Sequence, residues 1–120
     1  MKEYEIWIKK SEQDLDTAKY NLSGEKIDAG LFFLQQSAEK ALKAIYIKKF
    51  KELLKIHDLV IISRKLNAPP EIINFCKKLT PLYQFTRYPD VSETNKVENI
   101  NEFIFYSEEV LKWAKKKLKE

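Results

Sequence analysis

The hydrophobic positions along this chain recur at steps of three and four residues nearly everywhere, which is the period of an amphipathic helix. In the first segment they are Tyr4, Trp7, Ile8, Leu15, Ala18 and Leu22, with charged residues such as Asp14 between them. The pattern predicts a helix of about twenty residues. We expect it to end at Ser23 and Gly24, because glycine adopts the left-handed conformation at little cost.

A second helix is predicted from about Lys26 to about Phe50, with Asp28 in its first turn. Its apolar residues are not confined to one stripe. One stripe is Leu34, Ala38, Ala41 and Ile45, and further apolar residues are Ala29, Phe32 and Phe33. Such a helix is central, or faces both a core and a partner. Gly30 lowers helix propensity but permits a close approach of another segment.

The middle of the chain predicts two shorter elements. His57 to Ser63 resembles a buried strand by composition, but a lone strand has no neighbour to pair with, so we favour a short helix from about Asp58 to Leu66. Pro70 is well placed to open the next helix, and Pro81 is expected to kink or break it.

The last helix is predicted from about Asn95 to the C-terminus, with two apolar stripes. One is Val97, Ile100, Ile104, Leu111, Ala114 and Leu118; the other is Phe103, Tyr106, Val110 and Trp113. Four main helices with short connections predict an all-α fold, an antiparallel up-and-down four-helix bundle with one short extra helix. The 120 residues are expected to form one domain, residues 1–120.

Composition narrows the class of protein. Hydrophobic residues make up 44% and charged residues 33% of the chain. There is one cysteine, one histidine and no glycine-rich phosphate loop, so we expect no disulfide, no metal site and no cofactor. The charged N-terminus and the lack of a long apolar run predict a cytoplasmic protein with no membrane partner.

Charge is unevenly spread within the net +4. Six lysines between Lys40 and Lys55 accompany one acid, Glu52, and five lysines follow Val110 with one acid, Glu120. The segment from Tyr88 to Glu109 instead holds six acids. This asymmetry suits an anionic ligand, and equally a self-complementary homodimer.

Three places hold polar residues that the helical pattern alone does not explain. Gln36, Lys40 and Lys43 share one helix face, and Glu39 and Lys43 are spaced as an i, i+4 ion pair. The alternative is a polar stripe with this one salt bridge. The single histidine, His57, is able to act as acid, base or ligand, and the alternative is a structural hydrogen bond.

The third place is the segment Arg87, Tyr88, Pro89 and Asp90. The guanidinium fork of Arg87 suits phosphate or carboxylate, and Tyr88 offers a stacking face. The alternative is an Arg87–Asp90 pair that closes a turn.

Three motifs, QQSAEKALKA at residues 35–44, HDL at 57–59 and RYPD at 87–90, occur in an order and spacing that resemble the HEPN family. The resemblance extends from Trp7 to Trp113. It implies a dimeric bundle of four helices plus a short one, and a link to nucleotides or RNA. Some members of that family are metal-independent ribonucleases, and others pair with a minimal nucleotidyltransferase in toxin–antitoxin fashion.

One departure from that family matters for function. Ribonuclease members carry an arginine followed four to six residues later by a histidine, and neither Arg87 nor Arg64 is followed by one here. We therefore favour a non-catalytic module, not an enzyme, that binds a nucleotide or a phosphate-bearing partner. The expected binding residues are Arg87, Tyr88, Asp90, His57, Gln36, Lys40 and Lys43. Alternatives are a divergent ribonuclease that uses Arg87 and His57, and a purely structural dimerisation module.

Overall fold

The computed structural model describes residues 1–84 and 99–120, and these residues form helices without any strand. The elements are α1 (Glu3–Ser23), α2 (Ile27–Phe50), α3 (Leu59–Lys65), α4 (Pro70–Leu79), the 3₁₀ helix η1 (Thr80–Gln84) and α5 (Ile100–Leu118). The predicted all-α helical bundle is confirmed.

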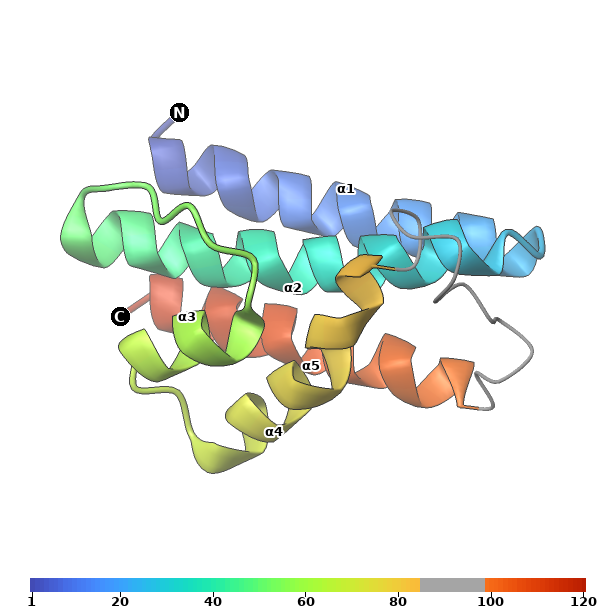
Figure 1. Cartoon of the computed structure of the whole chain (residues 1–120). Helices are drawn as coiled ribbons and strands as arrows, with labels where there is room; N and C mark the ends of the chain where they lie inside the picture. Colours follow the sequence, from blue (N-terminus) through green and yellow to red (C-terminus); the bar gives the residue numbers. More distant parts are fainter. Residues whose placement is uncertain (85–98) are drawn as a thin grey trace.

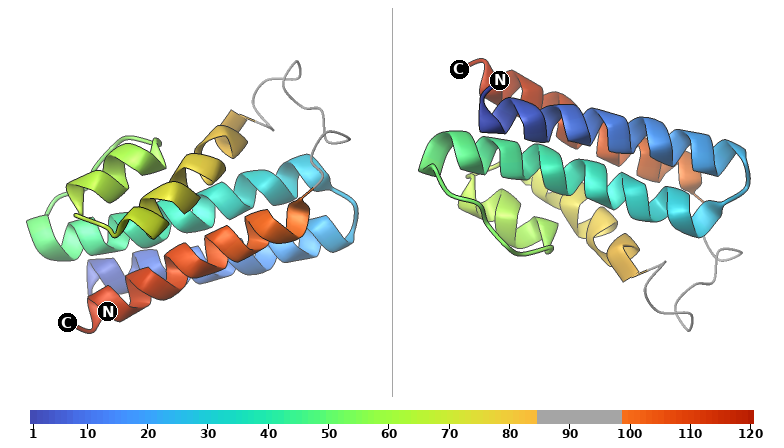
Figure 2. Two further views of the ribbon diagram at one scale, coloured as in Figure 1. Left: turned by 90° about the horizontal axis from the view of Figure 1, so that it is seen from below. Right: turned by 90° about the horizontal axis from the view of Figure 1, so that it is seen from above.

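The long helices α1, α2 and α5 lie side by side, and α1 runs opposite to the other two (Figure 1). The shorter α4 crosses α2 and α5 at an inclination, with α3 beside it (Figure 2). Helix α2 contacts all the other elements, as expected for a helix that is apolar on more than one side. The C-terminal ends of α2 and α5 and the N-terminus of α1 therefore gather at one end of the bundle.

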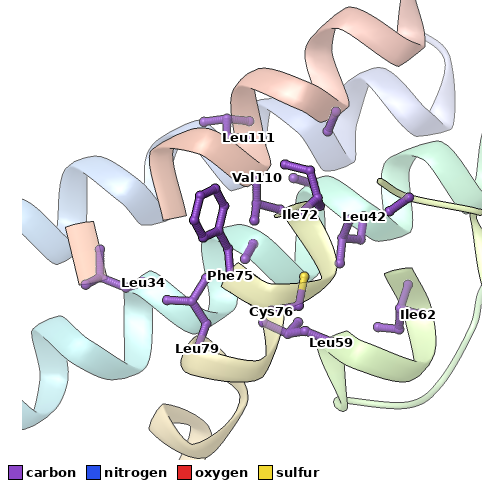
Figure 3. Packing of buried hydrophobic residues seen from close by; sticks show 14 of the residues in the cluster. Leu34, Leu42, Leu59, Ile62, Ile72, Phe75, Cys76, Leu79, Val110 and Leu111 are labelled. Carbon is purple, nitrogen blue, oxygen red and sulfur yellow. The ribbon is translucent and has the colours of Figure 1, made fainter. Parts of the chain in front are cut away.

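The core lies where α2, α3, α4 and α5 meet. Leu34 of α2 lies on the side of Leu79 of α4, and Leu42 of α2 lies beside Ile72 of α4; Val110 of α5 points toward α4 (Figure 3). Helix α1 adds Leu15 and Ala18 to the same cluster. Burial of such side chains stabilises the fold by about 25 cal/mol per Å² of apolar surface.

Most helix boundaries follow the local chemistry of the sequence. The carboxylate of Asp58 caps α3 by accepting hydrogen bonds from the backbone N–H groups of Val60 (2.9 Å) and Ile61 (3.2 Å). Pro70 opens α4, and the predicted break at Pro81 is the change from α-helix to η1.

Helix α1 ends at Ser23 with Gly24 as its C-cap, as predicted, but the left-handed residue differs from the prediction. Gly24 has φ −91°, and Glu25 instead takes the left-handed conformation with φ 64°. The backbone N–H of Gly24 continues to bond the carbonyl of Tyr20 (3.1 Å), so the reversal of the chain falls one residue later than expected.

Small residues bring α1 and α2 close together. The hydroxyl of Ser11 donates to the carbonyl of Ser37 (2.6 Å), and the hydroxyl of Ser37 donates to the carbonyl of Ser11 (2.8 Å). Further along, a Cβ added to Gly30 would lie 2.4 Å from Cγ of Leu22. The predicted close approach at Gly30 is thus confirmed, and it fixes the register of α2 and the polar groups that α2 carries.

Candidate functional site

The side chain of Glu39, near the middle of α2, is the centre of a buried polar cluster. Its carboxylate accepts hydrogen bonds from Nζ of Lys43 (2.8 Å) and from Nε2 of Gln35 (3.0 Å). It also lies 3.0 Å from Nδ1 of His57. Nε2 of Gln35 donates in addition to the backbone carbonyl of His57 (3.1 Å), so α2 holds both the ring and the backbone of that residue.

These partners determine the charge of Glu39. Burial alone would raise the pKa of this carboxyl, but the hydrogen bonds from Lys43 and Gln35, the charge of Lys43 and the contact with His57 outweigh burial. The pKa of Glu39 is therefore lower than its ordinary value of 4.5. The group is a carboxylate at neutral pH and acts only as a hydrogen-bond acceptor.

An acceptor at this position orients the imidazole of His57. When the ring is neutral, Nδ1 must carry the proton that is donated to Glu39, so Nε2 carries the lone pair. The side chain is 53% exposed, and Nε2 makes no hydrogen bond with the part of the chain that the structure describes. The imidazole is therefore accessible to a ligand from solvent.

Tyr83 of η1 forms one wall beside this imidazole. The two rings are stacked, with 4.5 Å between their centroids and 17° between their planes. Phe32 of α2 lies behind Tyr83 at 5.8 Å between centroids. The hydroxyl of Thr80 accepts a hydrogen bond from the backbone N–H of Leu59 (3.2 Å), which ties η1 to the start of α3.

A second carboxylate extends the polar cluster toward α1. Asp14 is almost fully buried, and it pairs with Lys40 of α2 and with Lys10 (3.3 Å). Gln36 connects the two carboxylates, because its Nε2 donates to Oε1 of Gln35 (2.7 Å) and its Oε1 accepts from Lys40 (3.4 Å). One line of polar groups thus runs from α1, along α2, to His57.

The structure brings four of the predicted site residues, Gln36, Lys40, Lys43 and His57, into this one line. The Glu39–Lys43 salt bridge of the alternative interpretation is present at 2.8 Å, and both side chains are buried, at 5% and 6% exposed. Lys40 and Lys43 each neutralise a buried carboxylate. Their ammonium groups are therefore not free to bind a ligand beside His57. Arg87, Tyr88 and Asp90 lie outside the described residues.

Sequence reasoning did not assign four members of the cluster to the site, namely Asp14, Gln35, Glu39 and Tyr83. The helical pattern places Asp14 among the polar gaps of its helix, but it lies three residues after the buried Ser11 and four before Ala18, a spacing that marks the buried face. The sequence pairs Glu39 only with Lys43, and it does not single out Tyr83. No local signal connects Glu39, His57 and Tyr83, because they come from three separate elements.

The described residues contain neither a metal-ligand cluster nor a membrane-spanning helix. Within residues 1–84 and 99–120, no three His, Cys, Asp or Glu side chains are grouped so that they could hold a metal ion. None of the described helices is both long and apolar enough to span a membrane.

Comparison with known proteins identifies the family. The model of the HEPN domain matches residues 4–118. An archaeal HEPN homologue, ST0689, superposes with a TM-score of 0.79 at 30% identity, covering 98% of each chain. The protein TT1696 from Thermus thermophilus has the same fold, with a TM-score of 0.86 at 20% identity over 98% of this chain and 99% of that one. No curated protein sequence matches. The chain belongs to the HEPN domain family.

Proposed function

We propose that this chain is a non-catalytic HEPN module that binds a nucleotide or a phosphate-bearing partner at a site formed by His57 and Tyr83. The observation that carries this proposal is the buried carboxylate of Glu39 behind a half-exposed imidazole. A fixed imidazole with a free nitrogen recognises a donor or, once protonated, a phosphate. The ring of Tyr83 gives the ligand an aromatic edge beside it.

The remaining predicted residues complete this proposal. Gln36, Lys40 and Lys43 act from within, because they hold the buried carboxylates of Asp14 and Glu39 in place behind the site. Arg87 follows Tyr83 by four residues in the sequence, and we include Arg87, Tyr88 and Asp90 as the phosphate-binding part of the site.

A divergent ribonuclease is the second candidate, and the Glu39–His57 pair favours it. A carboxylate that fixes an imidazole with Nε2 toward solvent is the arrangement of a general base, and the base in RNA cleavage removes the proton of the 2′-hydroxyl. Arg87 would supply the cation that stabilises the charged phosphorane. The missing histidine after Arg87 is the reason that binding remains our first proposal.

We further propose that the module is a homodimer and that it pairs with a minimal nucleotidyltransferase in a toxin–antitoxin-like system. Exposed apolar residues on the bundle, such as Ile61 (47%) and Phe105 (49%), support a partner surface. Light scattering at tens of micromolar tests the dimer, and a monomer mass contradicts it. A purely structural dimerisation module remains the alternative if no ligand binds.

The binding proposal is tested by calorimetric titration with a panel of nucleoside mono-, di- and triphosphates. The variants are His57→Ala and Tyr83→Leu, and the matched control is Tyr20→Leu, since Tyr20 is 81% exposed on α1 away from this cluster. We expect a nucleotide to bind the native protein and the control equally, and both site variants at least tenfold more weakly.

His57→Ala, together with a further variant, Arg87→Ala, separates the candidates. Cleavage of a labelled RNA by the native protein that is lost in His57→Ala and in Arg87→Ala would replace the binding proposal with the ribonuclease. If the native protein neither binds a nucleotide nor cleaves RNA, the purely structural dimerisation module is the proposal that remains.

A further inference from the structure

The second half of α5 carries a continuous face of lysines. Lys112, Lys115 and Lys116 of α5 and Lys119, which follows its last residue, are spaced at i, i+3, i+4 and i+7, and all four are exposed. Residues with this spacing share one helix face. Like charges at i and i+4 repel each other, so this face is unfavourable in the free protein and an anion would relieve the repulsion.

The lysines line a groove between α5 and α1. Its lining includes the buried side chains of Leu15 and Leu111, the four lysines named above and one acid, Glu108. The groove encloses about 490 Å³. Its positive charge lies on the end of the bundle where the C-terminus of α2 adds Lys48, Lys49 and Lys51.

The helix dipole and local ion pairs explain only some of the lysines on this face. The dipole favours cations in the last turn, whereas Lys112 precedes that turn. Lys115 pairs with Glu12 (2.8 Å), but Lys112, Lys116 and Lys119 form no ion pair with the part of the chain that the structure describes.

We propose that this groove binds the sugar-phosphate backbone of RNA, without reading its sequence. Lysines act as point charges that suit successive phosphates, and the described residues that line the groove include no aromatic side chain on which bases would stack. Lysine is depleted in protein–protein interfaces, which argues against an acidic protein as the occupant. The leucines form the buried floor of the groove and cannot insert into lipid, which argues against a membrane surface.

This inference deepens the proposed function, because it rests on the expectation that the ligand of this HEPN module is a nucleotide or a nucleic acid. The groove is made by α1 and α5, whereas His57 and Tyr83 lie on the α2–α3 connection and η1. The two sites share no residue, so each can be removed without altering the other.

The test measures binding of a fluorescein-labelled single-stranded RNA, about 20 nucleotides long, by anisotropy over a range of salt concentrations. The groove variant replaces Lys112, Lys116 and Lys119 with Gln. The control replaces Lys26, Lys77 and Lys78 with Gln; these lysines are exposed on α4 and before α2, so both variants have the same net charge.

We expect the native protein to bind the RNA at low salt and the groove variant to bind at least tenfold more weakly. The slope of log K against log salt should become about 2 less steep in the groove variant, since each lost phosphate contact on a single strand contributes about 0.7. The control should bind within twofold of the native protein.

Three outcomes would overturn the proposal: equal losses in both variants, no RNA binding by the native protein, or binding to phosphatidylserine vesicles without binding to RNA. Titration of the groove variant with nucleotides separates the two sites. Unchanged nucleotide binding together with weaker RNA binding supports two distinct sites. Loss of nucleotide binding in the groove variant would contradict the proposal that the groove is a separate site.

Discussion

Nδ1 of His57 lies 3.0 Å from the carboxylate of Glu39, although the two residues are separated by the C-terminal half of α2 and the connection that follows it. Gln35 fixes this arrangement, because its amide donates both to Glu39 (3.0 Å) and to the backbone carbonyl of His57 (3.1 Å). The proposed ligand site therefore depends on a carboxylate that no ligand needs to contact.

Replacement of Glu39 by Gln should change the dependence of stability on pH. Because the pKa of Glu39 is lowered in the folded protein, its stabilisation is present above its ordinary value of 4.5 and is lost as the pH falls through the lowered folded value. We expect Glu39→Gln to cost roughly 1–3 kcal/mol near pH 7, where Lys43 loses its partner. Urea unfolding should show this difference narrowing as the pH falls below 4.5, and a difference that stays constant with pH contradicts the account.

Asp14 and Lys40 should behave as a coupled pair. The Asp14 side chain is 1% exposed and that of Lys40 is 19% exposed, so removing the carboxylate leaves a poorly solvated charge. We expect Asp14→Leu to cost about 3 kcal/mol of unfolding free energy. The double variant Asp14→Leu, Lys40→Met should be more stable than the single one. Additive losses in this double-mutant cycle would show that the pair is not coupled.

Gly30→Ala should destabilise the bundle even though alanine favours helices. The added methyl group would overlap Cγ (2.4 Å) and Cδ2 (2.5 Å) of Leu22 and would lie 3.2 Å from the carbonyl of Ala18. We expect overpacking to cost about 1–3 kcal/mol and the better helix propensity of alanine to return about 1 kcal/mol, for a net loss of up to about 2 kcal/mol. Leu22→Ala should cost less in the Gly30→Ala background than in the native protein. Thermal melts of the four chains measure this, and a stabilised Gly30→Ala would disprove the contact.

Cys76 should be inert in the folded protein. Its side chain is fully buried against α3, and burial raises the pKa of the thiol to about 12. The thiolate is the reactive form, so alkylation near pH 8 should be slow in the native state and fast in denaturant. Mass spectrometry of the iodoacetamide adduct follows both rates. Equal rates in the two conditions would mean that α4 opens readily.

The helices were predictable because their signals are local. The apolar positions of α2 indicate a helix buried on more than one side, and Pro70 and Pro81 mark the limits of α4 through the missing backbone donor and the fixed φ of proline. The prediction puts the left-handed residue after α1 at Gly24, whereas the structure has it at Glu25. The preference of glycine for this conformation does not decide which of two neighbouring residues adopts it.

The site was predictable only in part. Helical spacing places Gln36, Lys40 and Lys43 together, but whether a charge on a helix faces solvent or a neighbouring helix depends on packing. The burial of Asp14 follows from the close approach of α1 and α2 at Ser11 and Ser37. The contact between His57 and Tyr83 depends on how η1 packs against the start of α3, which no pattern within either segment encodes.

The imidazole ¹⁵N signals of His57 test the central claim most directly, because His57 is the single histidine of the chain and its signals are unambiguous. Long-range ¹H–¹⁵N spectra near pH 7.5 should show a protonated Nδ1 and an unprotonated Nε2 in the neutral ring. Titration with the nucleotide that binds in calorimetry should shift Nε2 in a saturable manner, with the calorimetric affinity. A nucleotide that binds while both nitrogen signals of His57 stay unchanged would contradict the proposed site.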